Sequence, residues 1–235
     1  MSSQWRGEGG QHQGARPYQE DSWALKTLAD GSLLAVVADG MGGHVGGAVA
    51  SKLVVEAMVG TLEKGGTLAD GLQAANDAVG KGARSKRELD GMGSTVVAAI
   101  VSGDEVRWIS VGDSPFFLAN AGKLERLNAD HSMAPQIDAL LAKGMITAEE
   151  AASHPGRHTL REAVMGDPLT LIDEGRRRLG AGAQLLLCSD GVQSLAEEAI
   201  AAKAEQPVPQ LIKQVLAADA PHQDNITIVK LERKT

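Results

Sequence analysis

Four aspartates in this chain stand beside a glycine or an asparagine at the edge of an apolar, strand-like run. They are Asp39, Asp113, Asp190 and Asp224. A carboxylate at the end of a strand is held by a rigid element, yet it reaches a loop region that water and ligands can enter. Several converging carboxylates repel one another unless a cation lies between them. Because hard divalent cations prefer oxygen ligands, the pattern indicates a carboxylate-metal hydrolase.

A single Asp-Gly pair marks a tight turn more often than a metal site, so the order of the surrounding motifs matters. The chain contains, in sequence, residues 16–21 (RPYQED), 38–44 (ADGMGGH), 93–95 (GST), 111–114 (VGDS), 130–132 (DHS), 189–191 (SDG) and 224–227 (DNIT). This series resembles the metal-dependent Ser/Thr protein phosphatases of the PP2C type, in their compact bacterial form. The resemblance extends from about residue 12 to residue 231.

The resemblance implies an α+β fold with a central sandwich of two antiparallel β-sheets. Helices would flank the sandwich on both sides, in four layers (αββα). The resemblance also implies two core ions, Mn²⁺ or Mg²⁺, which Asp39 would bridge. Asp190 and Asp224 would hold one ion, and the backbone carbonyl of Gly40 would hold the other. Independently of the resemblance, short helical pieces indicate an inserted helical flap at about 133–166.

The remaining site residues also follow from the resemblance. Glu20 and Asp21 match an acidic pair that orients water bound to the metals. Asp113, together with Asp190, matches the ligands of a third, weaker ion. The implied activity is hydrolysis of phosphoserine and phosphothreonine in phosphoproteins by direct attack of a metal-bridging water, opposing a Ser/Thr kinase.

The residue chemistry supports the same function. Carboxylate and carbonyl oxygens select Mg²⁺ or Mn²⁺ rather than zinc. Two neighbouring cations can activate a water and clamp phosphoryl oxygens. The planar donor fork of Arg16 suits a phosphate group. Cys188 lies within an apolar run, where we expect a structural thiol and not a nucleophile.

Two histidines receive more modest roles. His44 could assist protonation of the leaving alkoxide. However, many relatives carry a histidine at the position that Met41 occupies here. We therefore interpret His44 as part of a helix start and leave the proton donor unassigned. We expect His131 to stabilise a loop by hydrogen bonding. We interpret the arginine run 176–178 as a solvated face, although it could contact phosphopeptides.

Two alternatives remain open at this point. One is a metal-dependent hydrolase of small phosphate esters. The other is a non-catalytic phosphoprotein-binding sensor that has lost its metals. All the expected ligands are present in the sequence, and this disfavours the second alternative.

The composition is that of a globular protein with a sizeable core. The chain has 235 residues, of which 43% are hydrophobic and 23% charged, with a net charge of −7. We expect a single domain over 1–235. The acidic balance argues against nucleic-acid binding. One cysteine suggests a reducing compartment, and no apolar run approaches membrane-spanning length, so we expect a cytoplasmic protein. We also expect a monomer.

Hydrophobic periodicity predicts the elements that position these residues. A hairpin over 23–28 and 32–38 precedes two helices, at about 48–62 and 68–79. Four strand runs follow at 94–101, 105–111, 115–119 and 123–127, then short helical pieces form the flap. A strand at 184–189, helices at 196–204 and 209–218, and a strand at 226–231 end the chain. Antiparallel strands in series favour a sandwich.

Overall fold

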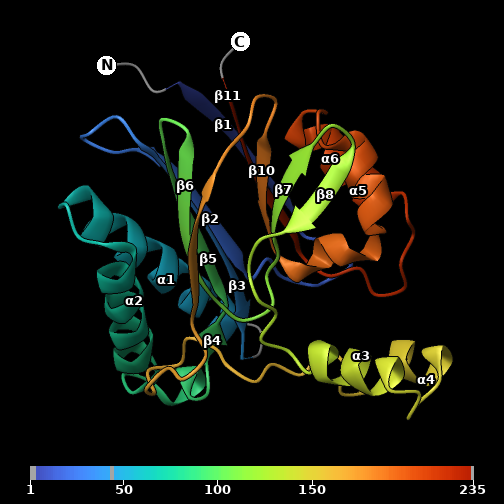
Figure 1. The fold of residues 1–235 in the computed structure, drawn as a ribbon. Coiled ribbons are helices and arrows are strands. Elements are labelled where there is room, and N and C mark those ends of the chain that lie inside the picture. The colour runs from blue at the N-terminus through green and yellow to red at the C-terminus, as the bar shows by residue number, and fades with distance from the viewer. Residues whose placement is uncertain (1–3, 43–44, 234–235) are drawn as a thin grey trace.

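Two antiparallel sheets form the centre of the molecule (Figure 1). The computed structural model describes residues 4–42 and 45–233. The sheet that we call the β3 sheet contains, in spatial order, β2 (Asp21–Thr27), β3 (Leu33–Met41), β5 (Val96–Ser102), β6 (Glu105–Val111) and β9 (Asp173–Arg178), with the short β4 (Gly93–Ser94) paired to β3. The β11 sheet contains β1 (Trp5–His12), β11 (Ile226–Arg233), β10 (Gln184–Cys188), β7 (Phe116–Asn120) and β8 (Lys123–Arg126).

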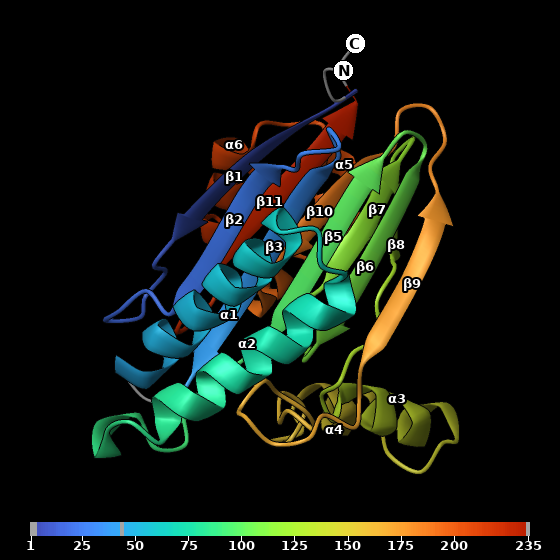
Figure 2. The same cartoon turned by 90° about the vertical axis from the view of Figure 1, so that its left-hand side faces the viewer.

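Helices cover the outer face of each sheet, so the molecule has four layers. The helices α1 (Val45–Glu63) and α2 (Leu68–Ala83) lie across the β3 sheet (Figure 2). The helices α5 (Glu197–Lys203) and α6 (Val208–Leu216) cover the β11 sheet. One apolar cluster lies under each helix pair and a third lies between the sheets. The αββα sandwich expected from the sequence is confirmed.

Strand β3 shows why the sequence specifies this arrangement. Its residues 34, 36 and 38 belong to the cluster under α1 and α2, whereas residues 33, 35 and 37 belong to the cluster between the sheets. Both faces of the strand are therefore buried, which explains the unbroken apolar run from Leu33 to Ala38. The run ends at Asp39, so the core fixes the position of that carboxylate.

The structure contains two strands that the sequence patterns did not predict. Strand β1 is rich in glycine because neighbouring side chains fill the space above it: a Cβ on Gly9 would collide with the ring of Trp23. Strand β9 contains mostly charged residues because it is an edge strand with exposed side chains. In addition, the run 94–101 forms two strands, β4 and β5, which are interrupted at Thr95.

The flap lies below the sandwich and contains α3 (Ala134–Ala142) and α4 (Ala148–Ala152) (Figure 1). The capping box at the start of α4 is confirmed, since Glu150 N–H donates to Thr147 Oγ1 over 3.1 Å and Thr147 N–H donates to Glu150 Oε2 over 2.7 Å. Isolated bridges between Ser132 and Leu160, and between Ser94 and Val164, attach its base to the core. Two short 3₁₀ helices, Arg87–Leu89 and Asp190–Ser194, complete the described elements.

Helix α1 corrects one expectation. Contrary to our prediction, this helix is long and apolar enough, by length and composition alone, to cross a membrane. In the structure one face of α1 packs on the β3 sheet through Ala50, Val54 and Met58, which are fully buried. The apolar composition is therefore accounted for by the core.

Candidate metal centre

Five aspartates from distant parts of the chain converge at one end of the sandwich. Asp21 opens β2 and is paired in register with Asp39 near the end of β3. Asp113 follows β6, Asp190 follows β10, and Asp224 precedes β11. The charge of Asp190 acts on Asp21, Asp39 and Asp113, and the charge of Asp224 acts on Asp190, so these carboxylates form one electrostatic cluster.

Burial and mutual repulsion make the cluster unfavourable as a group of bare anions. Burial, followed by the charges of Asp190 and Asp21, raises the pKa of Asp39 well above its usual value. Burial is also the main cause that raises the pKa of Asp21 to about 7, and it raises the pKa of Asp190 together with the charge of Asp224. Such shifts are expected where the folded protein concentrates negative charge that a cation is meant to neutralise.

Unpartnered oxygens point to the same conclusion. Among the described residues, Asp21 Oδ1 and Asp190 Oδ1 are buried and accept no hydrogen bond. Buried carboxylate oxygens nearly always have a partner, so these two oxygens are open to a ligand. Oxygen donors alone suit Mn²⁺ or Mg²⁺. The residues present therefore fit the ions that the sequence implies.

Arg16 forms an ion pair with Asp224 at the edge of the cluster. Its Nη2 is 2.5 Å from Asp224 Oδ2, and both side chains are partly open to solvent. Asp224 Oδ1 accepts a hydrogen bond from Asn225 N–H over 2.8 Å. Within the described ranges no three Asp, Glu, His or Cys side chains surround a single point as metal ligands. In this structure Arg16 contacts one oxygen of Asp224 and the backbone of Asn225 donates to the other.

Asn225 fixes the loop that carries Arg16, a role that the sequence did not assign. Its Nδ2 donates to the carbonyls of Gln13 and Tyr18 over 2.8 and 2.9 Å. Its Oδ1 accepts from Glu20 N–H over 2.7 Å. One amide thus holds the loop at three points, and the only sequence signal was its place directly after Asp224.

Hydroxyl groups fix the two paired aspartates. Thr95 Oγ1 accepts from Asp39 N–H over 3.1 Å, and Ser94 Oγ donates to Asp39 O over 2.9 Å. Thr227 Oγ1 donates to Asp21 Oδ2 over 2.6 Å. The GST and DNIT motifs could be recognised in the sequence, but only the folded chain shows that their hydroxyls position these carboxylates.

Glycines allow the strand ends to come together. A Cβ on Gly191 would collide with the carbonyl of Asn225, so the loops of Asp190 and Asp224 approach closely only because position 191 is glycine. A Cβ on Gly40 would collide with Gly47 O at the start of α1. Helix α1 therefore packs directly on the backbone that follows Asp39.

Comparison with known proteins agrees with this geometry. A family model described as protein phosphatase 2C matches residues 8–226. The chain belongs to the protein phosphatase 2C family.

Two relatives illustrate the extent of the match. The serine/threonine protein phosphatase PstP of Mycobacterium tuberculosis is 35% identical over 214 residues, which cover 85% of this chain and 40% of PstP. The chain thus spans about two fifths of the length of PstP. The serine/threonine phosphatase stp of Listeria monocytogenes is 31% identical over 233 residues, or 93% of this chain and 91% of stp.

Solved structures show the same fold. Stp1 from Staphylococcus aureus superposes with a TM-score of 0.87 at 27% identity, covering 100% of this chain and 97% of Stp1. The catalytic domain of PstP in complex with two manganese ions gives a TM-score of 0.79 at 29% identity, with 97% of each chain covered. A relative with this fold therefore binds two manganese ions.

The Asp113 loop of this protein phosphatase 2C chain is held by two side chains. His131 Nδ1 accepts from Gly112 N–H over 3.2 Å, so the expected loop-stabilising role of His131 is confirmed. Arg126 Nη2 donates to Asp113 O over 2.7 Å. Asp113 is 7% exposed, and burial followed by the charge of Asp190 raises its pKa to about 7.

The remaining candidate residues have different surroundings. The carboxylate of Glu20 lies against Gly47 at the start of α1, where the carbonyl oxygen of Gly40 also lies. The arginines at 176–178 lie on β9, and within that run Arg177 pairs with Glu125. His44 is outside the described residues. Cys188 is 2% exposed and burial raises the pKa of its thiol, as expected for a structural residue.

Proposed function

We propose that this chain is a metal-dependent protein phosphatase that hydrolyses phosphoserine and phosphothreonine. The observation that carries the proposal is the buried aspartate cluster, with unpartnered oxygens on Asp21 and Asp190, beside Arg16. The family membership of the chain supports the same reading.

Each residue has a role in this proposal. Asp39, Asp190, Asp224 and the carbonyl of Gly40 hold two Mn²⁺ or Mg²⁺ ions. When bound, these ions neutralise the carboxylates, activate water and withdraw charge from the phosphoryl group. Asp21 accepts a hydrogen bond from Thr227 and keeps its other oxygen for the attacking water. Glu20, whose carboxylate lies against Gly47 of α1, helps to orient this water.

Arg16 would bind the phosphate of the substrate. Its guanidinium is half-exposed, so an incoming phosphate can reach it. A phosphate would exchange one anionic partner of Arg16 for another and free Asp224 for an ion. The planar fork can make two parallel hydrogen bonds to phosphate oxygens, which also orients the ester for in-line attack.

The residues around Asp113 would form a weaker third ion site and part of the peptide site. A cavity of about 490 Å³ next to Asp113 is bounded by the flap and by the start of α5. Arg157 and His158 of the flap line it. We place the peptide chain of the phosphoprotein there, and we infer that a Ser/Thr kinase supplies the substrate in the cytoplasm.

The test is phosphate release from a phosphothreonine peptide and from an aryl phosphate, with Mn²⁺, Mg²⁺ or a chelator. We expect turnover of both substrates with either ion and none with the chelator. Full activity in chelator would overturn the metal-dependent mechanism. Turnover of the aryl phosphate with none of several phosphopeptides would instead identify a hydrolase of small esters.

A further inference from the structure

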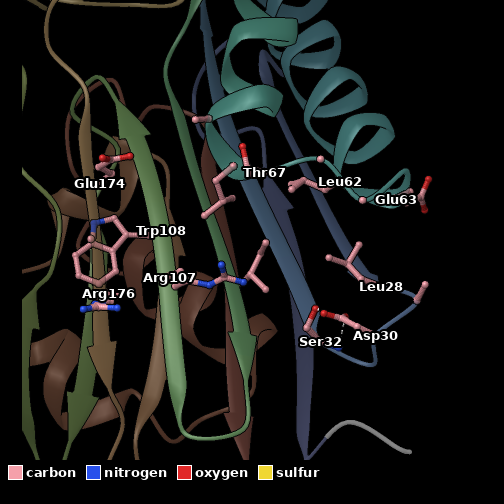
Figure 3. Close-up of a pocket in the computed structure, with 17 residues that line it drawn as sticks. Leu28, Asp30, Ser32, Leu62, Glu63, Thr67, Arg107, Trp108, Glu174 and Arg176 are labelled. Atoms are coloured by element: carbon pink, nitrogen blue, oxygen red, sulfur yellow. Dashed lines mark hydrogen bonds between the residues drawn. The ribbon is translucent and has the colours of Figure 1, made fainter.

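A second cavity lies at the end of the β3 sheet that is remote from the carboxylates. It has a volume of about 680 Å³ and is bounded by the β2–β3 turn, the α1–α2 connection and strands β6 and β9. Figure 3 shows Asp30 and Ser32 on one side of it, Arg107 extending from β6, and Glu174 and Arg176 on β9. Strand β3 begins beside this cavity and ends at the aspartate cluster, so the two sites are separate.

Two arginines on neighbouring strands line this cavity. Arg107 and Arg176 are directly opposite in the register of β6 and β9, which places both side chains on the same face of the sheet. Like charges in such a pair are destabilising. Neither guanidinium makes a hydrogen bond or an ion pair with any other residue that the structure describes.

The nearby carboxylates do not neutralise these arginines. Asp30 accepts hydrogen bonds from Ser32 N–H over 2.9 Å and from Ser32 Oγ over 2.6 Å. These bonds are the main reason why the pKa of Asp30 is lowered, and the charge of Arg107 contributes less. Glu63 and Glu174 also line the cavity, but their side chains are exposed to water. The two guanidinium groups therefore remain available.

An apolar groove continues from the charged cavity. A neighbouring cavity of about 470 Å³ shares Ala69 and Glu174 with the first. Its other lining residues include Leu72, Ile109, Leu169 and Ile172. Ile172 is 46% exposed, so its side chain is accessible in this groove. The cavity that holds the two arginines, together with Asp30, Glu63 and Glu174, thus adjoins an apolar channel between α2 and β9.

We propose that this cavity binds an amphipathic organic anion. The carboxylate, phosphate or sulfonate group of the ligand lies between Arg107 and Arg176, whose donor forks match such oxygens. The apolar body of the ligand follows the groove toward Ile172. The cavity volumes are in the range of small-molecule sites. This site is distinct from the proposed phosphatase centre.

The test is a fluorescence titration with 8-anilinonaphthalene-1-sulfonate, an aromatic sulfonate that matches this chemistry. The titration is done in chelator, so its result does not depend on the phosphatase proposal. We expect one saturable site. Arg107→Gln and Arg176→Gln should each raise the Kd about tenfold, which corresponds to about 1.4 kcal/mol. Ala69→Phe should abolish binding by filling the junction of the two cavities.

The matched control is Arg178→Gln, since Arg178 lies on the same strand but outside the cavity. This variant should leave the Kd within about twofold, and circular dichroism should show all variants folded. Glu174→Gln should lower the Kd, because it removes a repulsive charge. Absence of saturable binding, or an unchanged Kd in both cavity arginine variants, would overturn the proposal.

Discussion

Each end of the β3 sheet holds side chains of like charge opposite each other, but in different surroundings. At one end Asp21 and Asp113 are 5% and 7% exposed and belong to a cluster of aspartates. At the other end Arg107 and Arg176 are opposite each other in the register of the adjacent strands β6 and β9, and both are exposed. Water screens the second pair, whereas burial strengthens the repulsion within the first. Like charges at the surface cost little, but like charges in the interior require a counter-ion.

The two ends of the sheet also differ in hydrogen bonding. The aspartates are held by Thr95, Thr227 and the Asn225 loop, so they cannot move apart to relieve their repulsion. The arginines are long, unpartnered side chains that can turn into water. The aspartate end is therefore preorganised for a fixed ligand, and the arginine end is adaptable. Removing a charge should have a large effect at the first end and a small one at the second.

The largest expected effect is at Asp39. Asp39→Asn keeps the shape of the side chain but removes the central charge of the cluster, so the ions bind poorly. We expect phosphopeptide turnover to fall by more than about a hundredfold, beyond the range typical of residues that only support metal ligands. Asp104→Asn, at the opposite end of the same sheet, is the matched control and should stay within about twofold. Equal effects of the two substitutions would remove Asp39 from the centre.

A smaller loss is expected when the support of the Arg16 loop is removed. Asn225→Ala deletes the bonds to Gln13, Tyr18 and Glu20 without touching a charged group. Because Arg16 would then be poorly placed, kcat/KM for a phosphopeptide should fall about ten- to a hundredfold. Initial rates measured with saturating Mn²⁺ test this. A change of less than about twofold would show that the loop holds its position by other contacts.

The thermal stability of the protein should increase when a cation neutralises the repulsion among the aspartates. Mn²⁺ at a hundred times its Kd should stabilise the fold by about 2.7 kcal/mol and raise the Tm by about 5–10 °C. Thermal unfolding followed by circular dichroism measures this shift. Asp104→Asn should show the same shift, whereas Asp39→Asn should lose most of it.

The metal-free protein should also lose stability as the pH rises. The pKa values of Asp21 and Asp113 are raised from 3.8 to about 7 in the folded protein. Between these values the folded state keeps protons that the unfolded state has released, so the free energy of unfolding decreases toward pH 7 and is lowest above it. In chelator the Tm should be lower at pH 8 than at pH 6. A Tm that rises over this range would contradict the pKa shifts.

The smallest effect is expected at Cys188, which lies on β10 two residues before Asp190. Its thiol is buried under α5 and α6, so Cys188→Ala should cost about 1 kcal/mol of stability and leave turnover within about twofold. Urea unfolding and initial rates measure the two quantities. A large loss of turnover with unchanged stability would indicate that the thiol takes part in the chemistry.

Much of the fold could be predicted because buried elements produce recognisable patterns of hydrophobic residues in the sequence. Strand β3 could be recognised as an unbroken apolar run because both of its faces are buried. Helix α2 could be recognised because its buried residues recur with the helical period. Strands β1 and β9 show no such hydrophobic pattern. The first is glycine-rich to make room for Trp23, and the second is an exposed edge strand.

The sequence by itself determined the family motifs, the sandwich, and the aspartates that end apolar strands, because local composition and spacing reflect burial and turn geometry. Only the tertiary structure decided which groups meet. It paired Asp21 with Asp39, placed Asn225 under the Arg16 loop, and set Arg107 opposite Arg176. These contacts join residues far apart in the chain. Their energies depend on distance and burial, which no short stretch of sequence records.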